Sequence, residues 1–221
     1  ALPHSRAGAR SYRSASGKIV GAPSRARSPI RMPKALARIS LSLIMLSACT
    51  SSQQPPYGVP IETGQLQNAA INEASGLTMS QHEDGRLWTL NDGGSPPVIY
   101  ALAHDGTEHG SVQLSNATNV DWEDMASFEF NDQHWLLIAD VGDNFSNREQ
   151  VTLYVVEEPD MSQPETTVAA KIRFRYPDGP HDAEAVAVDP IGQLLYVLTK
   201  RAVPARLYSL PLTFADSDVV T

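Results

Sequence analysis

Cysteine is almost absent from this chain of 221 residues, in which Cys49 is the only one. A single cysteine excludes an intramolecular disulfide framework, and no paired His/Cys spacing typical of zinc ligands occurs. The G-x-S-x-G motif of a nucleophile elbow is missing too. The folded part must therefore be held by its apolar core, and the sequence offers no support for zinc chemistry or elbow-type nucleophilic catalysis.

The N-terminal region also lacks an apolar run long enough to cross a membrane. Its apolar core, Ile39–Leu46, follows Lys34 and Arg38 and is too short to span roughly 30 Å of hydrocarbon. A basic start, a short apolar core and small residues, in that order, are typical of a secretory signal peptide. We therefore expect residues 32–48 to be an export signal.

The export signal ends in a motif that resembles the lipobox of bacterial lipoproteins, Leu46-Ser47-Ala48-Cys49. In that family the peptide is cut before the cysteine, which then carries the acyl chains. The resemblance implies that Cys49 is lipidated, that residues 49–58 are a tether, and that the lipid anchors the protein on the periplasmic side of a bacterial envelope. The lack of an aspartate behind the cysteine favours the outer membrane. The alternative is an ordinary signal peptide that ends in a free cysteine.

Basic residues are scarce after Cys49, where only 8 of the 17 lie together with all 25 acidic residues. These 8 basic and 25 acidic residues give a net charge of −17, against −8 for the whole chain. Such a charge repels phosphate backbones, so we expect no nucleic-acid partner. Residues 1–31 are basic and contain no acid, and we expect them to be disordered or to lie upstream of the true start. The alternative is a basic arm that binds nucleic acid.

The middle of the chain, residues 119–156, has the pattern of three consecutive β-strands. Met125–Phe130 alternates apolar with small or polar residues, and Trp135–Ala139 and Val151–Val156 are short apolar runs. Runs of this length, separated by Asn, Asp and Gly, are typical of strands joined by turns. Lys171–Tyr176 alternates cleanly and predicts a fourth, outer strand.

Weaker copies of this four-strand pattern lie at residues 73–114 and 182–210. A four-stranded unit that repeats every 40 to 50 residues or so is typical of propeller blades. We therefore expect residues 59–221 to form an incomplete, all-β, β-propeller-like domain with about three antiparallel blades. We also expect a lone strand at Val59–Leu66. The alternative is an ordinary antiparallel meander or sandwich.

An acidic residue opens each unit, and aligning these acids matches Glu73, Glu123 and Glu184. Because neighbouring antiparallel strands run in opposite directions, the start of each first strand and the end of each second strand should share one edge. The turns at that edge carry further oxygen ligands and two basic residues, which are Asp92, Asp140, Asp143, Asn144, Lys200 and Arg201.

Carboxylates brought together at such an edge either take up protons or bind a cation. Oxygen ligands favour Ca²⁺, with Mg²⁺ next. The sequence therefore predicts a cation site formed by the three aligned glutamates and the four Asp and Asn residues of the turns. The alternative is a purely structural role for these acids, in turns and between blades.

Three segments resemble the phytase-like or esterase-like propeller superfamily, in which an acid-small-apolar-small pattern recurs in each blade. They are Glu73-Ala-Ser-Gly-Leu-Thr, Trp122-Glu-Asp-Met-Ala and Ala183-Glu-Ala-Val-Ala. Propeller phytases bind several Ca²⁺ ions in an acidic cleft and hydrolyse phosphate esters. The resemblance implies a ligand-binding role for Lys200 and Arg201 as partners of a phosphate or carboxylate.

Two functions remain open from the sequence. The first is a membrane-anchored lipoprotein whose acidic domain binds or scaffolds a protein or small ligand, with or without Ca²⁺. The second is a Ca²⁺-dependent hydrolase of phosphate or carboxylic esters. We favour the first, because no catalytic set of residues stands out in the sequence.

Overall fold

The computed structural model describes residues 58–219, which belong to one compact unit. Every regular element within this range is a β-strand, and the thirteen strands form three sheets. No helix of the described range is long and apolar enough to cross a membrane. The expected export signal, Cys49 and the basic segment 1–31 lie outside the described residues. The all-β class is confirmed.

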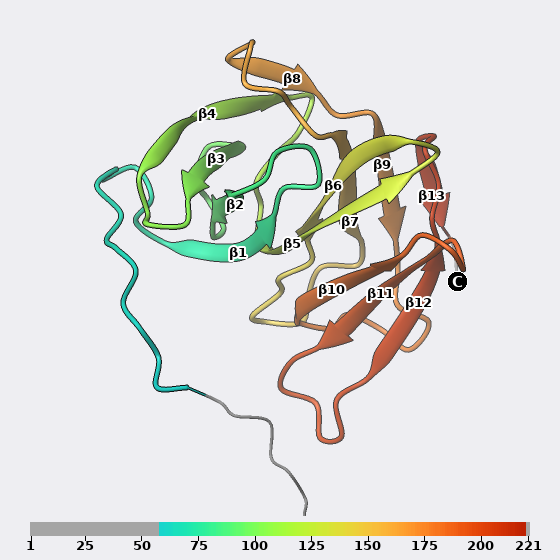
Figure 1. Cartoon of the computed structure of the whole chain (residues 1–221). Coiled ribbons are helices and arrows are strands. Elements are labelled where there is room, and N and C mark those ends of the chain that lie inside the picture. Colours follow the sequence, from blue (N-terminus) through green and yellow to red (C-terminus); the bar gives the residue numbers. More distant parts are fainter. Residues whose placement is uncertain (1–57, 220–221) are drawn as a thin grey trace, which may run out of the picture. The chain divides into compact units, whose positions relative to one another are not determined.

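The first sheet consists of four consecutive antiparallel strands and one parallel strand at its outer edge, in the order β1-β2-β3-β4-β8 (Figure 1). Its strands are β1 (Ala74–Met79), β2 (Arg86–Asn91), β3 (Val98–Ala103), β4 (Glu108–Ser115) and β8 (Glu165–Thr167). The β1–β2 turn ends at Gly85, whose φ of 83° is a conformation that glycine adopts without steric cost. Strands β1 to β4 confirm the upstream copy of the sequence pattern.

The second sheet is formed by the middle of the chain, in the order β13-β9-β7-β6-β5. Its strands are β5 (Trp122–Phe130), β6 (Gln133–Asp140), β7 (Val151–Glu157), β9 (Ala170–Phe174) and β13 (Ser217–Val219). Asn131 and Asp132 join β5 to β6 with φ of 54° and 59°. Two residues in the left-handed region make the tight turn that matches the twist of a hairpin, as their residue types predict.

The third sheet has three antiparallel strands, β10 (Ala183–Asp189), β11 (Leu194–Thr199) and β12 (Leu207–Pro211). The first strands of the three sheets lie next to one another, with β5 between β1 and β10. This is the arrangement expected for consecutive blades. Within residues 58–219, however, the sheets form neither a closed barrel nor a closed ring.

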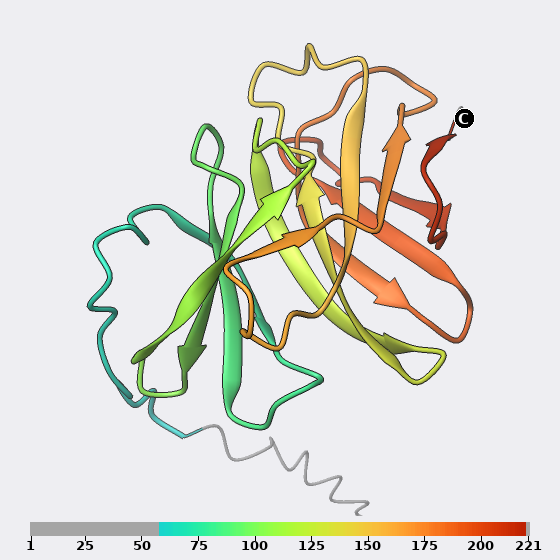
Figure 2. The same cartoon turned by 90° about the horizontal axis from the view of Figure 1, so that it is seen from above.

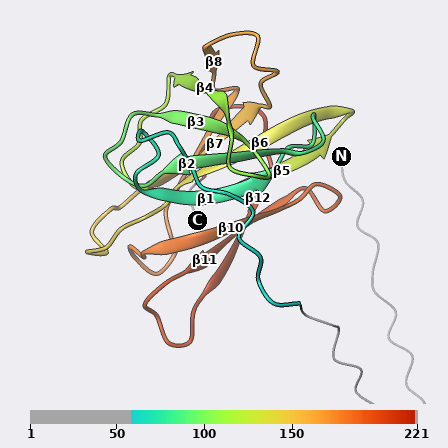
Figure 3. The same ribbon diagram turned by 60° about the vertical axis from the view of Figure 1, so that its left-hand side comes forward.

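Two three-residue strands link the sheets in a way that the sequence did not predict. Strand β8, which lies between β7 and β9 in the chain, pairs in parallel with β4 of the first sheet, and β13 pairs in parallel with β9 of the second (Figure 2). Figure 3 shows β8 beside β4 from another side. Strand β8 comes from the segment that forms the second sheet but extends the first sheet. Strand β13 follows the third sheet in the chain but extends the second sheet, so consecutive sheets are linked.

The same irregularity recurs at the start of each first strand. Trp122 pairs with Asp140 and Asp124 with Ala139, so Glu123 is the extra residue of a β-bulge. The register shifts in the same way between Ala74 and Leu77 and between Ala183 and Ala185. A bulge bends the strand and redirects one side chain. The three units are therefore structural repeats, including their irregular positions.

Two apolar cores lie between the three sheets, one at each contact between neighbouring sheets. One contains Trp88, Leu90 and Ile99 of the first sheet packed against Leu136 and Ile138 of the second, all completely buried. The other, between the second and third sheets, contains completely buried residues of both, among them Leu137, Leu153, Ile172, Leu195 and Val197. Each such side chain contributes about 1.5–3 kcal/mol by leaving water. The domain is thus held by apolar packing, as the lack of disulfides requires.

One sequence expectation is wrong in this region. Val59–Leu66 forms no strand, and the first strand of the described chain is β1. Val59 and Ile61 are exposed, and this segment makes no ladder hydrogen bonds to a neighbouring strand. Its apolar residues alone were too weak a signal, because a lone strand needs an open sheet edge to pair with.

Candidate functional site

The edge where the first strands begin also holds the turns that follow the second strands. Trp122 pairs with Asp140 and Ala183 with Thr199, so the residues just before β5 and β10 lie beside these turns. The Lys200 N–H donates to the Asp182 carbonyl at 2.8 Å. The edge predicted from strand direction is confirmed, and the carboxylates gathered on it are Asp92, Asp121, Glu123, Asp182 and Glu184. We call these five residues the acidic edge.

The acidic edge contains two groups of three carboxylates. The first group is Asp92, Asp121 and Glu123, and the second is Glu123, Asp182 and Glu184. In each group, one oxygen from every residue lies within 4.8 Å of the others. Glu123 belongs to both groups, because it is the bulged residue of the central first strand. Three carboxylates so close together are a set of oxygen ligands that could hold one divalent cation.

Two glycines make room for the first group. A Cβ atom added to Gly142 would overlap the carboxylate oxygens of Glu123 and Asp121. A Cβ added to Gly93 would overlap Asp121 and the backbone of Val120. A side chain at position 93 would clash with the backbone of Val120 and Asp121, whereas one at position 142 would displace the ends of the two carboxylate side chains.

Asn119 fixes the position of Asp121 relative to the turn that carries Asp92. Its buried side chain donates to the carbonyls of Asn91 and Asp92 at 3.2 and 2.9 Å, and its Oδ1 accepts the Trp122 N–H at 3.1 Å. The start of β5 is thereby tied to the turn of the first sheet. The first group is assembled by these local bonds.

The carboxylates of the acidic edge raise one another's proton affinity. Burial raises the pKa of Glu123 to about 8, and the neighbouring carboxylates, Glu184 first, add to the rise. Burial also raises the pKa of Asp121, with Asp92 adding to the effect and Arg148 opposing it. Glu123 is consequently mostly protonated at neutral pH unless a cation replaces the proton.

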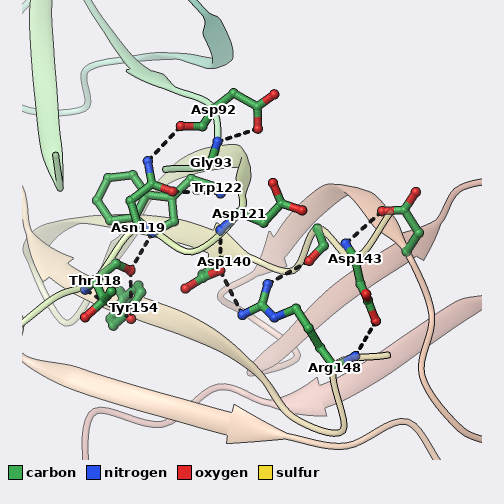
Figure 4. Close-up of polar contacts among 12 residues, drawn as sticks. Asp92, Gly93, Thr118, Asn119, Asp121, Trp122, Asp140, Asp143, Arg148 and Tyr154 are labelled. Atoms are coloured by element: carbon green, nitrogen blue, oxygen red, sulfur yellow. Dashed lines mark hydrogen bonds and ion pairs between the residues drawn. The ribbon is translucent and has the colours of Figure 1, made fainter. Parts of the chain in front are cut away.

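Asp140 and Asp143 occupy different positions from those the cation prediction required, since neither belongs to either group. Asp140 is buried, accepts the Asp121 N–H at 3.0 Å and pairs with Arg148 Nη2 at 2.9 Å (Figure 4). Asp143 is also buried; its Oδ2 accepts the Arg148 N–H at 2.7 Å, and its own N–H donates to Asp182 Oδ1 at 2.9 Å. These two acids hold the loop between β6 and β7 in place.

Glu73 was aligned with Glu123 in the sequence, and the strand registers show that this alignment is two residues out. Because Ala74 pairs with Asn91 as Trp122 pairs with Asp140, the counterpart of Glu73 is Asp121, and the counterpart of Glu123 is Ser75. Glu73 is exposed and belongs to neither group. Ser75 instead donates its hydroxyl to the Glu123 carbonyl at 2.7 Å.

Lys200 and Arg201, in the turn after β11, are paired with acids of the second group. Lys200 forms an ion pair with Glu184, and Arg201 Nε lies 2.6 Å from Asp182 Oδ2. Arg201 also donates to the exposed Asn144 Oδ1. A phosphate or carboxylate ligand would have to compete with these partners for Lys200 and Arg201.

Sequence reasoning missed Asp121 and Asp182, which complete the two groups. A signal was present, because Asp121-Trp122-Glu123 and Asp182-Ala183-Glu184 repeat an Asp-x-Glu pattern at the start of both first strands. An open hollow of about 440 Å³ lies beside Asp121, lined also by Gly93, Asn144 and Arg148 among others. It gives solvent and ligands access to Asp121, one member of the first group.

Comparison with known proteins adds no assignment: no model of a known protein family matches the chain, and neither does any curated protein. The chemistry of the site therefore rests on its geometry alone.

Proposed function

We propose that the protein is a membrane-anchored bacterial lipoprotein whose acidic all-β domain acts as a binding or scaffolding module and holds Ca²⁺ at the acidic edge. The observation that supports the cation is the position of Glu123, which contributes to both groups of carboxylates. The open hollow beside Asp121 supports a ligand bound next to the ion. In this proposal the cation bridges the domain and an anionic or carbonyl group of its partner.

We further propose that the three sheets are blades of a propeller-type domain. The proposal is supported by the side-by-side first strands and by the recurrence of the same bulge in all three sheets. In such a fold the first strands surround an axis, and the acidic edge would lie at one end of that axis. A ligand that spans several blades would then meet the ion at the centre.

Membrane anchoring is proposed from the lipobox resemblance at Cys49. Stable anchoring takes more than one acyl chain, which a lipidated N-terminal cysteine provides. Mass spectrometry of the N-terminal peptide should show an acylated Cys49, and Cys49→Ala should move the protein from the membrane fraction to the soluble fraction. Unchanged membrane association of Cys49→Ala would contradict the anchor.

The cation is tested by thermal melting of the metal-free protein with Ca²⁺ and with a chelator. An ion that binds only the folded state adds about 2.7 kcal/mol of stability at a hundredfold excess over its dissociation constant. We expect a clear rise in the melting midpoint, accompanied by proton release at pH 7 because the ion displaces the proton of Glu123. Calorimetry in two buffers of different ionisation enthalpy measures that release.

A matched pair of variants distinguishes Ca²⁺ binding at the acidic edge from a general effect of removing one negative charge. Glu123→Gln should abolish the Ca²⁺ response, whereas Glu129→Gln, an exposed position on the same strand, should keep it. An equal response in both variants, or no response in the parent protein, would rule out the proposed site.

Hydrolysis of phosphate or carboxylic esters remains the second candidate, and no observation favours it over binding. The two basic residues assigned to a phosphate, Lys200 and Arg201, are already paired with Glu184 and Asp182. We therefore place binding first, and an esterase and phosphatase screen follows only if the cation is found.

A further inference from the structure

The repeated register defines two faces on every sheet. The face that points to the next sheet in the chain, which we call the trailing face, carries matching positions on the second and third strands. These are Leu90 and Ile99 in the first sheet, Ala139 and Leu153 in the second, and Leu198 and Leu207 in the third. The opposite, leading face carries Leu77 and Tyr100, Met125 and Tyr154, and Val186 and Tyr208 at matching positions.

Both internal contacts between sheets join a trailing face to a leading face. Leu90 and Ile99 of the first sheet share a core with Met125 and Tyr154 of the second. Ala139 and Leu153 of the second sheet share the other core with residues on the leading face of the third, Val186 and Tyr208 among them. The molecule thus uses one packing mode twice.

The trailing face of the third sheet and the leading face of the first sheet keep apolar residues at these positions, and part of each face is exposed. Leu207 on the third sheet is 64% exposed, whereas its counterpart Leu153 is fully buried. Leu77 on the first sheet is 60% exposed, whereas its counterpart Met125 is 3% exposed. Leu198 and Met79 widen the two open patches. Equivalent positions of the repeats are thus buried at the internal contacts and exposed at these two faces.

Only part of the leading face of the first sheet is covered within the described residues. Ile71, from the segment before β1, packs on Tyr100 and Leu102 and buries them. The half of the face formed by β1, with Leu77 and Met79, remains open. In both internal contacts the first strands of the two sheets lie side by side, β1 beside β5 and β5 beside β10. The open half of the first sheet therefore corresponds to the half that lies at these strand contacts.

We propose that two copies of this chain associate head to tail, with the trailing face of the third sheet of one copy against the leading face of the first sheet of the other. A second copy is the occupant that the observations favour, because each copy carries one face of each kind and the same faces already pack together twice within the chain. When the contact is made in both directions, each face of one copy meets the complementary face of the other, and the assembly stops at two chains.

Analytical ultracentrifugation of the full chain at physiological ionic strength tests the association. We expect a particle of twice the chain mass. Leu207→Glu and Leu77→Glu should each raise the dissociation constant at least tenfold, because each places a charge in one of the two kinds of face. Ile191→Glu is the matched control, since Ile191 is apolar and 95% exposed but lies in the β10–β11 turn, away from both faces. It should leave the constant unchanged.

Mixing the two face variants distinguishes head-to-tail from face-to-itself association. A pair of one Leu207→Glu and one Leu77→Glu chain keeps one intact contact, so the mixture should associate more tightly than either variant alone. A monomeric parent chain, or association that neither variant weakens, would overturn the proposal; the second result would indicate contacts through residues outside these faces. Thermal melting of each variant confirms that it is folded, which the exposure of Leu77 and Leu207 leads us to expect.

Discussion

The two groups of carboxylates at the acidic edge share Glu123 but differ in what balances their charge. The second group has Lys200 and Arg201 in ion pairs with Glu184 and Asp182. In the described part of the chain, the acids of the first group form no ion pair. The same backbone arrangement therefore carries one group that is neutralised by the chain and one that is not.

The difference originates in the turn after each second strand. Counting from the matched strand ends, Asp92 and Gly93 of the first turn correspond to Lys200 and Arg201 of the third. The turn after β2 thus has an acid and a glycine at the two positions where the turn after β11 has two basic side chains. The comparison indicates that the first group, and not the second, is the stronger position for an external cation.

The largest effect is expected at Arg148, which neutralises the buried acid below the first group. Arg148→Met leaves Asp140 buried without its ion pair, and breaking a buried pair costs about 3–5 kcal/mol. Urea unfolding should show this loss, and the double variant with Asp140→Asn should recover much of it. The control is Arg206→Met, whose partner Asp178 is partly exposed and whose loss should cost less than about 1 kcal/mol. Equal losses at the two arginines would contradict the assigned role of Arg148.

The strands were predictable from the sequence, because a buried face and two-residue turns leave local signals. The alternation in β5 and the Asn131-Asp132 turn are such signals, and both were interpreted correctly. Strands β8 and β13 were not predictable in this way. Each has three residues and owes its existence to the edge of a neighbouring sheet, which no short window of sequence contains.

The location of the candidate site was predictable from the sequence, but only some of its residues were. Strand direction located the edge, and Asp92, Glu123 and Glu184 lie there in one or other of the two groups of carboxylates. Asp140 and Asp143 were assigned to the cation because they are acids in a turn at that edge. Their actual partner, Arg148, is set by how the β6–β7 loop folds back, which is a tertiary contact.

Exchanging charge between the two turns should exchange the behaviour of the two groups. Asp92→Lys places an ammonium beside the first group, so the Ca²⁺ response should disappear and stability in chelator should not fall. Lys200→Asp removes a cation from the second group and should lower stability in chelator by about 1 kcal/mol, because the pair is partly exposed. Melting with Ca²⁺ and with chelator measures both effects.

The control for this exchange is Lys171→Asp, which changes the net charge as much as Lys200→Asp does. Lys171 donates to Asn116 Oδ1, outside both carboxylate groups. It should leave the Ca²⁺ response unchanged. A response that followed net charge in all three variants would mean that the two groups do not differ.

A further expected effect is a pH dependence of stability that belongs to Glu123. Its pKa is raised to about 8 in the folded metal-free protein from 4.5, so the folded state holds a proton that the unfolded state has released. Stability should therefore fall as pH rises between these two values and level off above the upper one. Because Glu123 is only half-buried, solvent screening reduces the size of the fall. Melting of the chelated protein across this range should show a steeper fall for the parent than for Glu123→Gln, and saturating Ca²⁺ should remove the difference. Parallel curves in chelator would show that burial and the neighbouring carboxylates do not raise the pKa of Glu123 in the folded protein.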